Sequence, residues 1–222
     1  IAGEQCGQWR TKLMGHICIE SLQLGVGLIE PAQQPIELLH QRSQLSGLAR
    51  TVQSLVKEPG TAQETPWHQD QPYYNVDGFQ NCSMWMPVDP VPGESTLEFL
   101  AGSHLGGWLM PRSFMDSQAK WFPEGTLHEL PTIEGFRDQH QILAWALEPG
   151  DVVFFHMLTV HHAYGVPGAN RRRAFSLRFL GDDTTHAPRP WRTSPPFEGL
   201  EAELPAGAPM DHPLFPLLRT SS

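Results

Sequence analysis

Short apolar runs separated by turn residues fill the chain from residue 66 onward. Four of them read as strands, at residues 83–88, 96–100, 152–155 and 173–180. Gly102 stops the second run, and the Gly150-Asp151 turn precedes the third. Several short strands joined by Gly- and Pro-containing turns predict a mainly β domain of the sandwich, jelly-roll or barrel type.

The first third of the chain has a different pattern and is interpreted as a partly helical region over residues 1–55. Its apolar residues lie at spacings of three, four and three, which puts them on one helical face. These residues are Leu45, Leu48, Val52 and Leu55. The end of the run, residues 54–57, also fits a strand that enters the turn at 58–60, and the pattern leaves both possibilities open.

Two irregular segments interrupt or follow the strand pattern. Residues 105–141 mix aromatic side chains with polar residues and prolines, and the aromatic ones include Trp108, Phe114, Trp121 and Phe122. A long irregular insertion in a compact domain is often a lid or a binding loop, so a lid-like role is expected here. Residues 187–222 are Pro-rich and are expected to form a tail that wraps the outside of the domain.

Length and composition agree with one β-rich domain over residues 1–222. A chain of 222 residues favours a single domain and can bury a sizeable core without disulfides. The 20 Gly and 21 Pro residues are many for a helical protein and suit a turn-rich β architecture.

Charge and cysteine content narrow the expected partners and location. The net charge of −9 disfavours a nucleic-acid partner, since such proteins usually carry a basic face. The sequence contains no run of 18 apolar residues, so no membrane span is expected, and the first ten residues lack a signal-peptide pattern. The odd set of Cys6, Cys18 and Cys82 has no metal-binding spacing and suggests ordinary thiols in a reducing cytoplasm. The sequence does not indicate an oligomeric state.

The first candidate for chemistry is the run Trp67-His68-Gln69-Asp70. In a strand, residues two apart point to the same face, so His68 and Asp70 would present an imidazole and a carboxylate side by side. Two His and one carboxylate on one face of a metal leave three positions open, as in non-haem iron(II) oxygenases. So short a motif also occurs by chance as a surface or structural pair.

A third ligand is expected from a histidine far along the chain. The strand at 152–155 is followed by His156, His161 and His162, and in an extended segment only one of the last two can face the metal. The next strand opens with residues 171–173, which are all Arg. A buried Arg suits the distal carboxylate of 2-oxoglutarate, although three Arg on a solvated turn is the alternative reading.

Taken in order, these pieces resemble the phytanoyl-CoA dioxygenase family over roughly residues 55–185. The runs are WHQDQPYYNVDG, the strand with Trp85, STLEFLAGSH, GDVVFFHMLTVHHAYG and RRRAFSLRF. In that family an Arg follows the distal His by eleven positions, and this spacing selects His161 and Arg172. The resemblance implies iron bound by His68, Asp70 and His161, with Trp85 and Arg172 at the co-substrate.

The resemblance implies a double-stranded β-helix, a cupin-like jelly roll with flanking helices. It implies iron(II), 2-oxoglutarate and dioxygen, with succinate and carbon dioxide as co-products. Asp70 keeps the acid that related halogenases replace, so hydroxylation of a small organic molecule is implied. Ala163 departs from the family, which often has a small hydroxyl residue there. Remaining alternatives are an acyl-CoA hydroxylase, a cupin-like metal protein without oxygenase activity, and a non-catalytic binding module.

For the other polar and aromatic residues near these motifs, a structural role is at least as well supported as a role in the site. His156 is expected to pack near the core without binding metal. His104 is read as structural, or otherwise as a pocket residue. Tyr73 and Tyr74 fit either a pocket lining or the core.

Overall fold

The computed structural model of the chain describes residues 26–29, 45–110, 127–191, 193 and 195–216. The aromatic residues Phe114, Trp121 and Phe122, together with Cys6 and Cys18, lie outside the described residues. So does most of the region 1–44.

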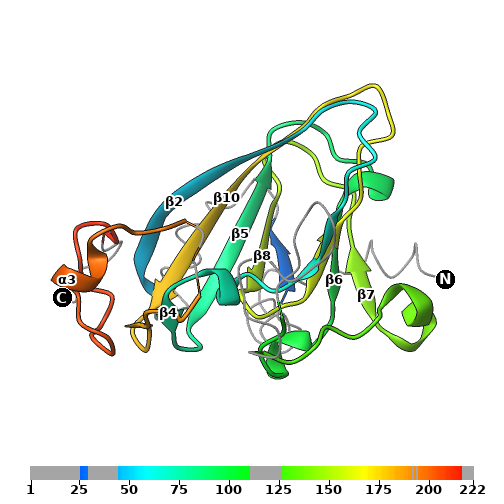
Figure 1. Cartoon of the computed structure of the whole chain (residues 1–222). Coiled ribbons are helices and arrows are strands. Elements are labelled where there is room, and N and C mark those ends of the chain that lie inside the picture. Colours follow the sequence, from blue (N-terminus) through cyan, green and yellow to red (C-terminus); the bar gives the residue numbers. More distant parts are fainter. Residues whose placement is uncertain (1–25, 30–44, 111–126, 192, 194, 217–222) are drawn as a thin grey trace.

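Two antiparallel sheets face each other (Figure 1). The larger sheet has the order β1 (Val26–Ile29), β8 (Val152–His156), β5 (Asn81–Pro87), β10 (Arg172–Gly181) and β2 (Leu45–Lys57). The smaller sheet has the order β3 (Thr65–His68), β9 (His161–Ala163), β6 (Leu97–Leu100) and β7 (Ile142–Ala144). This arrangement confirms the predicted mainly β, jelly-roll class.

The strands predicted from short apolar runs are all present. Residues 83–88, 96–100, 152–155 and 173–180 correspond to β5, β6, β8 and β10. Gly102, which follows β6, has a φ of 74°, and Gly150, which precedes β8, has a φ of 104°. Glycine reaches such positive φ values without a Cβ clash, which explains the turns at these two positions.

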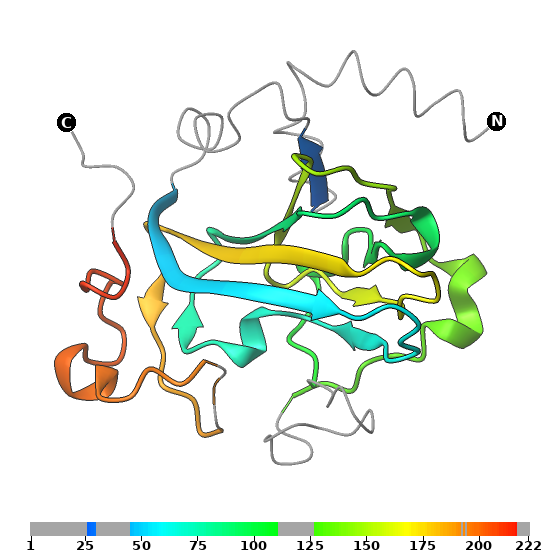
Figure 2. The same ribbon diagram turned by 90° about the horizontal axis from the view of Figure 1, so that it is seen from above.

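The helical reading of residues 45–55 is wrong, because β2 is a 13-residue strand that covers them. Figure 2 shows β2 running along β10, and the two strands pair over most of their length. The pairing contains two register shifts, next to Ser176 and next to Leu180. Such irregularities add residues to one strand, so its apolar period departs from two and imitates helical spacing. The strand alternative for residues 54–57 is the correct one.

The core lies between the two sheets. Inward side chains of the larger sheet meet those of the smaller sheet in one buried cluster, which includes Trp85, Phe99, Phe155, Ala163 and Ala174. Ring packing continues from this cluster toward β9, since the ring centroids of Phe155 and His161 are 4.7 Å apart. The metal-binding candidates therefore lie at the edge of the apolar core.

Short elements close the domain. A two-stranded sheet is formed by β4 (Val76–Asp77) and β11 (Thr185–His186). The helices of the described residues are η1 (Gln71–Tyr73), η2 (Gly93–Ser95), η3 (Ser103–Leu105), η4 (Glu134–Gln139) and α3 (Leu200–Glu203). Within the tail, Leu200, Leu204 and Phe215 pack into a buried cluster with Tyr74.

Among the described residues, no helix has the length and apolar character needed to cross a bilayer.

Candidate metal centre

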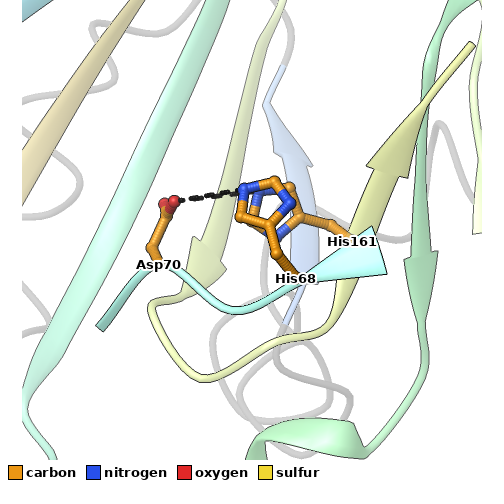
Figure 3. A group of neighbouring side chains, drawn as sticks. All are labelled: His68, Asp70 and His161. Carbon is orange, nitrogen blue, oxygen red and sulfur yellow. Dashed lines mark ion pairs between the residues drawn. The ribbon is translucent and has the colours of Figure 1, made fainter. Parts of the chain in front are cut away.

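Three side chains from two distant segments of the chain come together at one end of the core (Figure 3). His68, Asp70 and His161 are 7%, 5% and 5% exposed. One ligand atom from each lies within 4.8 Å of the others. The structure thus brings together the three residues that the sequence suggested as ligands.

His68 and Asp70 are neighbours for a different reason than the one predicted. β3 ends at His68, and Asp70 has φ −76° and ψ −44°, so it is no longer in a strand. The turn is fixed because the amides of Asp70 and Gln71 both donate to the carbonyl oxygen of Met157, at 2.9 and 3.0 Å. The expectation of strand alternation was wrong, although the two side chains do converge.

His161 faces His68 across the antiparallel pair of β3 and β9. The two residues are register partners, and their ring centroids are 4.1 Å apart. His162 points to the opposite face, where its ring stacks on Trp67 at 5.1 Å. The prediction that only one of the two adjacent histidines reaches the metal position agrees with this geometry.

Both imidazoles present the same nitrogen to Asp70. Nδ1 of His68 lies 2.8 Å from the carbonyl oxygen of Pro66, and Nδ1 of His161 lies 3.0 Å from that of Thr159. A carbonyl oxygen only accepts, so each Nδ1 carries the hydrogen and each Nε2 keeps its lone pair. The Nε2 atoms lie 3.7 and 3.9 Å from Oδ1 of Asp70. Two nitrogen donors and one carboxylate oxygen directed at one point can hold iron(II).

The two carboxylate oxygens of Asp70 have separate partners. Oδ1 faces the two imidazoles. Oδ2 accepts a hydrogen bond from the Ser83 hydroxyl and lies 3.0 Å from Nη2 of Arg178. One oxygen is thus held by the wall of the larger sheet, and the other is directed toward the metal position.

The protonation states at this site suit a metal ion. Burial and the neighbouring His161 lower the pKa of His68 to about 3, and burial lowers the pKa of His161 as well. Burial alone would raise the pKa of Asp70, but the charge of Arg178 and the two imidazoles outweigh it and lower the pKa to about 2. Neutral imidazoles and an ionised carboxylate are the forms that bind metals.

Arg172 lies on β10 and is 7% exposed. Its guanidinium donates to the backbone carbonyl of Ser95, and among the described residues no carboxylate pairs with it. Burial lowers its pKa to about 10. A buried cation without an acidic partner is costly unless an anion is bound beside it.

The neighbouring arginines already have acidic partners. Arg171 pairs with Glu58 at 2.9 Å, Arg173 with Asp89 at 2.7 Å, and Arg178 with Asp70. Arg171 and Arg173 are exposed, whereas Arg172 is buried and both Arg172 and Arg173 lie in β10, so the three arginines do not form a solvated turn.

A second cation lies beside Arg172. Lys57 is its register partner on β2. Burial, then the charge of Arg172, lower the pKa of Lys57 to about 8, and Glu64 opposes the shift. The Lys57 amine donates to the carbonyl oxygens of Ala163 and Tyr164, at 3.2 and 3.0 Å. Arg172 and Lys57 therefore place two positive charges next to each other at this end of the barrel.

Trp85 lies on β5 between Ser83 and Pro87, the register partners of Arg178 and Ala174, and Ala163 lies two residues after His161 on β9. Both are buried in the cluster between the sheets, and Ala174, two residues after Arg172, belongs to the same cluster. Ala163 is paired with Leu97 and Thr65. Trp85 is therefore in a position to contact a molecule that spans the two sites.

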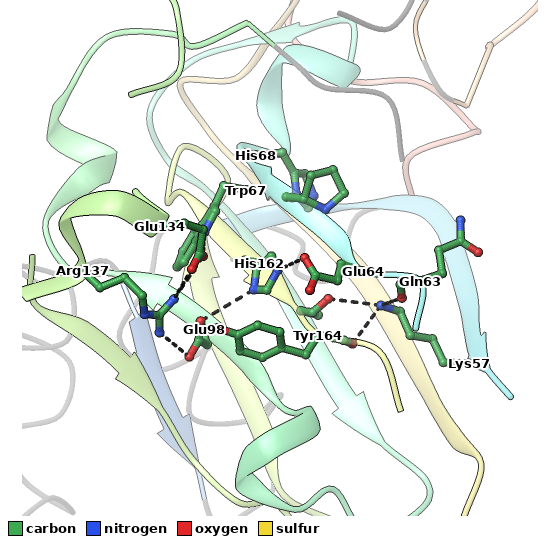
Figure 4. Close-up of polar contacts among 12 residues, drawn as sticks. Lys57, Gln63, Glu64, Trp67, His68, Glu98, Glu134, Arg137, His162 and Tyr164 are labelled. Atoms are coloured by element: carbon green, nitrogen blue, oxygen red, sulfur yellow. Dashed lines mark hydrogen bonds and ion pairs between the residues drawn. The ribbon is translucent and has the colours of Figure 1, made fainter. Parts of the chain in front are cut away.

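A polar layer lies behind the metal-bearing strands (Figure 4). His162 is between two carboxylates, with Nε2 3.3 Å from Glu64 and Nδ1 3.6 Å from Glu98. Glu98 pairs with Arg137 at 2.8 Å. Glu134, in the same helix as Arg137, accepts from the indole of Trp67 at 2.7 Å. These contacts join β3, β6, β9 and η4 and hold the strands of His68 and His161 in place.

The remaining candidates have structural contacts. Nδ1 of His156 accepts from the Leu158 amide at 3.0 Å, and its Nε2 donates to the carbonyl of Phe79 at 2.7 Å. His104 is buried, and its ring centroid is 5.5 Å from that of His156. Neither belongs to the cluster of possible ligands.

The two tyrosines of the motif differ in their surroundings. Tyr73 places its ring edge toward His68, with centroids 5.9 Å apart. The ring of Tyr74 lies 5.4 Å from the guanidinium of Arg178.

Sequence reasoning missed the partners of Asp70. Arg178 was not expected to contact Asp70, yet it lies six residues after Arg172 and therefore on the same face of the strand. Ser83 is its register partner on β5. The even spacing of the two arginines was the available signal.

Comparisons with known proteins agree with the fold. The sequence model of a family described as phytanoyl-CoA dioxygenase matches residues 33–174. A search of curated proteins found no match.

Several solved structures resemble the chain. A non-heme alpha-ketoglutarate-dependent carbocyclase, SnoK from nogalamycin biosynthesis, is 18% identical with a TM-score of 0.65, over 94% of this chain and 97% of SnoK. SnoN, a non-heme alpha-ketoglutarate-dependent epimerase from nogalamycin biosynthesis, is 20% identical with a TM-score of 0.58. The match covers 89% of this chain and 77% of SnoN. The non-heme monooxygenase ThoJ is 16% identical with a TM-score of 0.54. The match covers 69% of this chain and 54% of ThoJ. At these identities the likeness establishes the shared fold.

Proposed function

The chain belongs to the phytanoyl-CoA dioxygenase family, and on that basis we propose that it is an iron(II)- and 2-oxoglutarate-dependent oxygenase. Iron(II), 2-oxoglutarate and dioxygen are the cofactor and co-substrates of this class. The observation that carries the proposal is the buried Arg172, which no carboxylate of the described residues balances, in the same barrel as the His-Asp-His cluster.

Each residue of the site has one role in this proposal. His68 and His161 bind the metal through Nε2, and Asp70 binds it through Oδ1. Arg172 would hold the far carboxylate of 2-oxoglutarate, and the buried Trp85 would contact the co-substrate. When bound, iron(II) and 2-oxoglutarate supply oxidising chemistry that yields succinate and carbon dioxide and transfers oxygen to the substrate. The protein orients these groups and excludes water from them.

A cupin-like metal protein without a co-substrate explains the three ligands but not Arg172. Such a protein would gain nothing from a buried guanidinium without an anion, and it would carry its desolvation cost. Lys57 adds a second positive charge at the same end of the barrel. Both observations favour a dianionic co-substrate over a simple metal site.

We propose hydroxylation of a free small organic molecule as the specific reaction. The sequence has only three Lys and a net charge of −9, which suits poorly the phosphates of a CoA ester. SnoK and SnoN, which have similar folds, are described as a carbocyclase and an epimerase. The reaction of this chain therefore has to be identified from the mass of its product. A hydroxylated product is heavier than its substrate by one oxygen atom.

The chain is proposed to act as one domain. The lid-like role expected for residues 105–141 stays a prediction, because residues 111–126 lie outside the described residues. The described start of this segment is tied to the metal motif by Gln69, the residue between His68 and Asp70. The side chain of Gln69 donates to the Gly107 carbonyl at 3.2 Å and accepts from the Leu109 amide at 2.8 Å. Trp108 lies next to them and stacks under Arg189 at 4.6 Å.

The test is the release of succinate from 2-oxoglutarate with added iron(II), first without and then with candidate substrates. The proposal predicts slow succinate release that the wild-type chain supports and that His161→Ala abolishes. Absence of any iron-dependent succinate release by metal-loaded wild-type protein would leave the metal-protein alternative.

A further inference from the structure

Asp70 is held by two donors that come from the opposite sheet. Its Oδ2 accepts from the Ser83 hydroxyl and pairs with Arg178 at 3.0 Å, whereas its Oδ1 faces the two imidazoles. We propose that Arg178 is a positioning residue of the metal centre, which restricts Asp70 to binding the metal through one oxygen. This inference rests on the metal ligands of the proposed function.

The placement of Arg178 follows from the sheet. Arg178 and Ser83 are register partners on the adjacent strands β10 and β5, and both side chains are buried. Side chains of paired residues lie on the same face of a sheet, so both donors point at Asp70. The contact is thus built into the barrel wall rather than into a loop.

The guanidinium is also held independently of Asp70. Its Nη1 donates to the Ser176 hydroxyl and to the Leu177 carbonyl, the latter at 3.2 Å. The Tyr74 ring packs 5.4 Å from its central carbon. A planar group with several fixed donors can hold these partners at once, which a lysine amine on a flexible stem cannot. Arg178 is therefore expected to keep its place when Asp70 is removed.

Holding Oδ2 has two consequences at the metal. A carboxylate that binds through one oxygen uses one coordination position, and two imidazoles with it leave three positions open. The charge of Arg178 also offsets that of Asp70. The positive charge of a divalent metal then remains to be balanced by a dianionic co-substrate.

The same geometry makes a specific prediction for a variant that lacks the carboxylate. In Asp70→Gly, the Arg178 guanidinium would be a buried cation without an acidic partner, next to a vacant ligand position. Such a charge is strongly stabilised by an anion. Formate is the smallest carboxylate that can replace the side chain, so it should bind there and complete the metal site.

The first experiment titrates Co²⁺ into Asp70→Gly and into Asp70→Gly/Arg178→Met, with and without sodium formate, by the visible absorption of the metal. Formate should tighten Co²⁺ binding about tenfold or more in the single variant and leave the double variant unchanged. An equal effect of formate on both variants, or no effect on either, would overturn the role of Arg178.

The second experiment keeps Asp70 in place and does not depend on the folding of the first variants. The separation of the antisymmetric and symmetric carboxylate stretches is larger for one-oxygen than for two-oxygen binding. It is read from infrared difference spectra of ¹³C-Asp-labelled protein with and without Co²⁺. Arg178→Met should narrow this separation, and Arg171→Met, an exposed control, should not. An unchanged separation in Arg178→Met would overturn the proposal.

Neither experiment requires turnover. If both give the expected results and no succinate is released, the proposed function fails and the positioning role stands. If succinate is released while both experiments give the contrary results, the proposed function stands and the positioning role of Arg178 fails.

Discussion

His68 and His161 lie opposite each other across β3 and β9, with ring centroids 4.1 Å apart. Their neighbours in the sequence, Trp67 before His68 and His162 after His161, stack on the other side of the same strand pair. The strand pair thus has one face for the metal and one face for structural contacts, and the adjacent histidines have distinct roles.

A matched pair of variants tests this division. His161→Ala removes a proposed ligand and should abolish metal retention, measured as bound Fe²⁺ or Co²⁺ per chain. His162→Gln should retain the metal, although disturbed contacts to Glu64 and Glu98 should cost about 1–3 kcal/mol of unfolding free energy. Metal loss in His162→Gln with full occupancy in His161→Ala would reverse the assignment.

Arg172→Ala should raise the 2-oxoglutarate concentration needed for half-saturation while the metal still binds. Loss of a buried, charge-assisted pair costs about 2–5 kcal/mol. Arg171→Ala is the control, because Arg171 is exposed and already paired with Glu58. An unchanged 2-oxoglutarate affinity in Arg172→Ala would transfer the role to another cation at that end of the barrel, with Lys57 the nearest candidate.

The stability of the metal-free protein should fall as the pH decreases from about 6.5 toward 4. Burial holds the pKa of His68 at about 3 and that of His156 at about 4, below the usual 6.5. The unfolded chain therefore takes up protons in a pH range where the folded chain does not, and unfolding becomes easier. The lowered pKa of Asp70 removes further stability only below its usual 3.8.

Urea unfolding of the metal-free chain at several pH values measures this effect. His156→Gln should show a shallower decline than the wild-type chain because one of the buried imidazoles is gone. A stability that is constant between about pH 6.5 and 4 would contradict the burial of these imidazoles.

Free organic acids should bind at least as well as the corresponding CoA esters. Phosphates of CoA require clustered cations. Arg171, Arg173 and Arg178 are already paired with acidic side chains. Matched binding assays at two salt concentrations compare the two forms. Tight, salt-sensitive binding of CoA esters alone would favour the acyl-CoA alternative.

The strands β5, β6, β8 and β10 were predictable because each contains a short apolar run next to a turn with Gly or Pro. The 45–55 segment was not, since its pairing with β10 outweighs the helical spacing of its leucines. Strand formation there depends on a partner more than a hundred residues away, which local periodicity does not report.

The site was predictable as a set of residues but not as a geometry. His68 and Asp70 converge through a turn that the Met157 carbonyl fixes, and this contact joins distant parts of the chain. The partnership of Asp70 with Arg178 likewise depends on the register of β5 and β10. Such contacts become visible only when the sheets are assembled.

The proposed function requires that 2-oxoglutarate chelates a metal held by His68, Asp70 and His161 while Arg172 binds its far carboxylate. Anaerobic titration of 2-oxoglutarate into the iron(II)-loaded chain tests it, because chelation through a carboxylate and a keto oxygen produces a visible charge-transfer absorption. This absorption is expected in the wild-type chain and in Arg171→Ala. Arg172→Ala should show it only at much higher 2-oxoglutarate concentration, and His161→Ala should not show it. A wild-type chain that binds iron(II) but develops no such absorption with 2-oxoglutarate would contradict it.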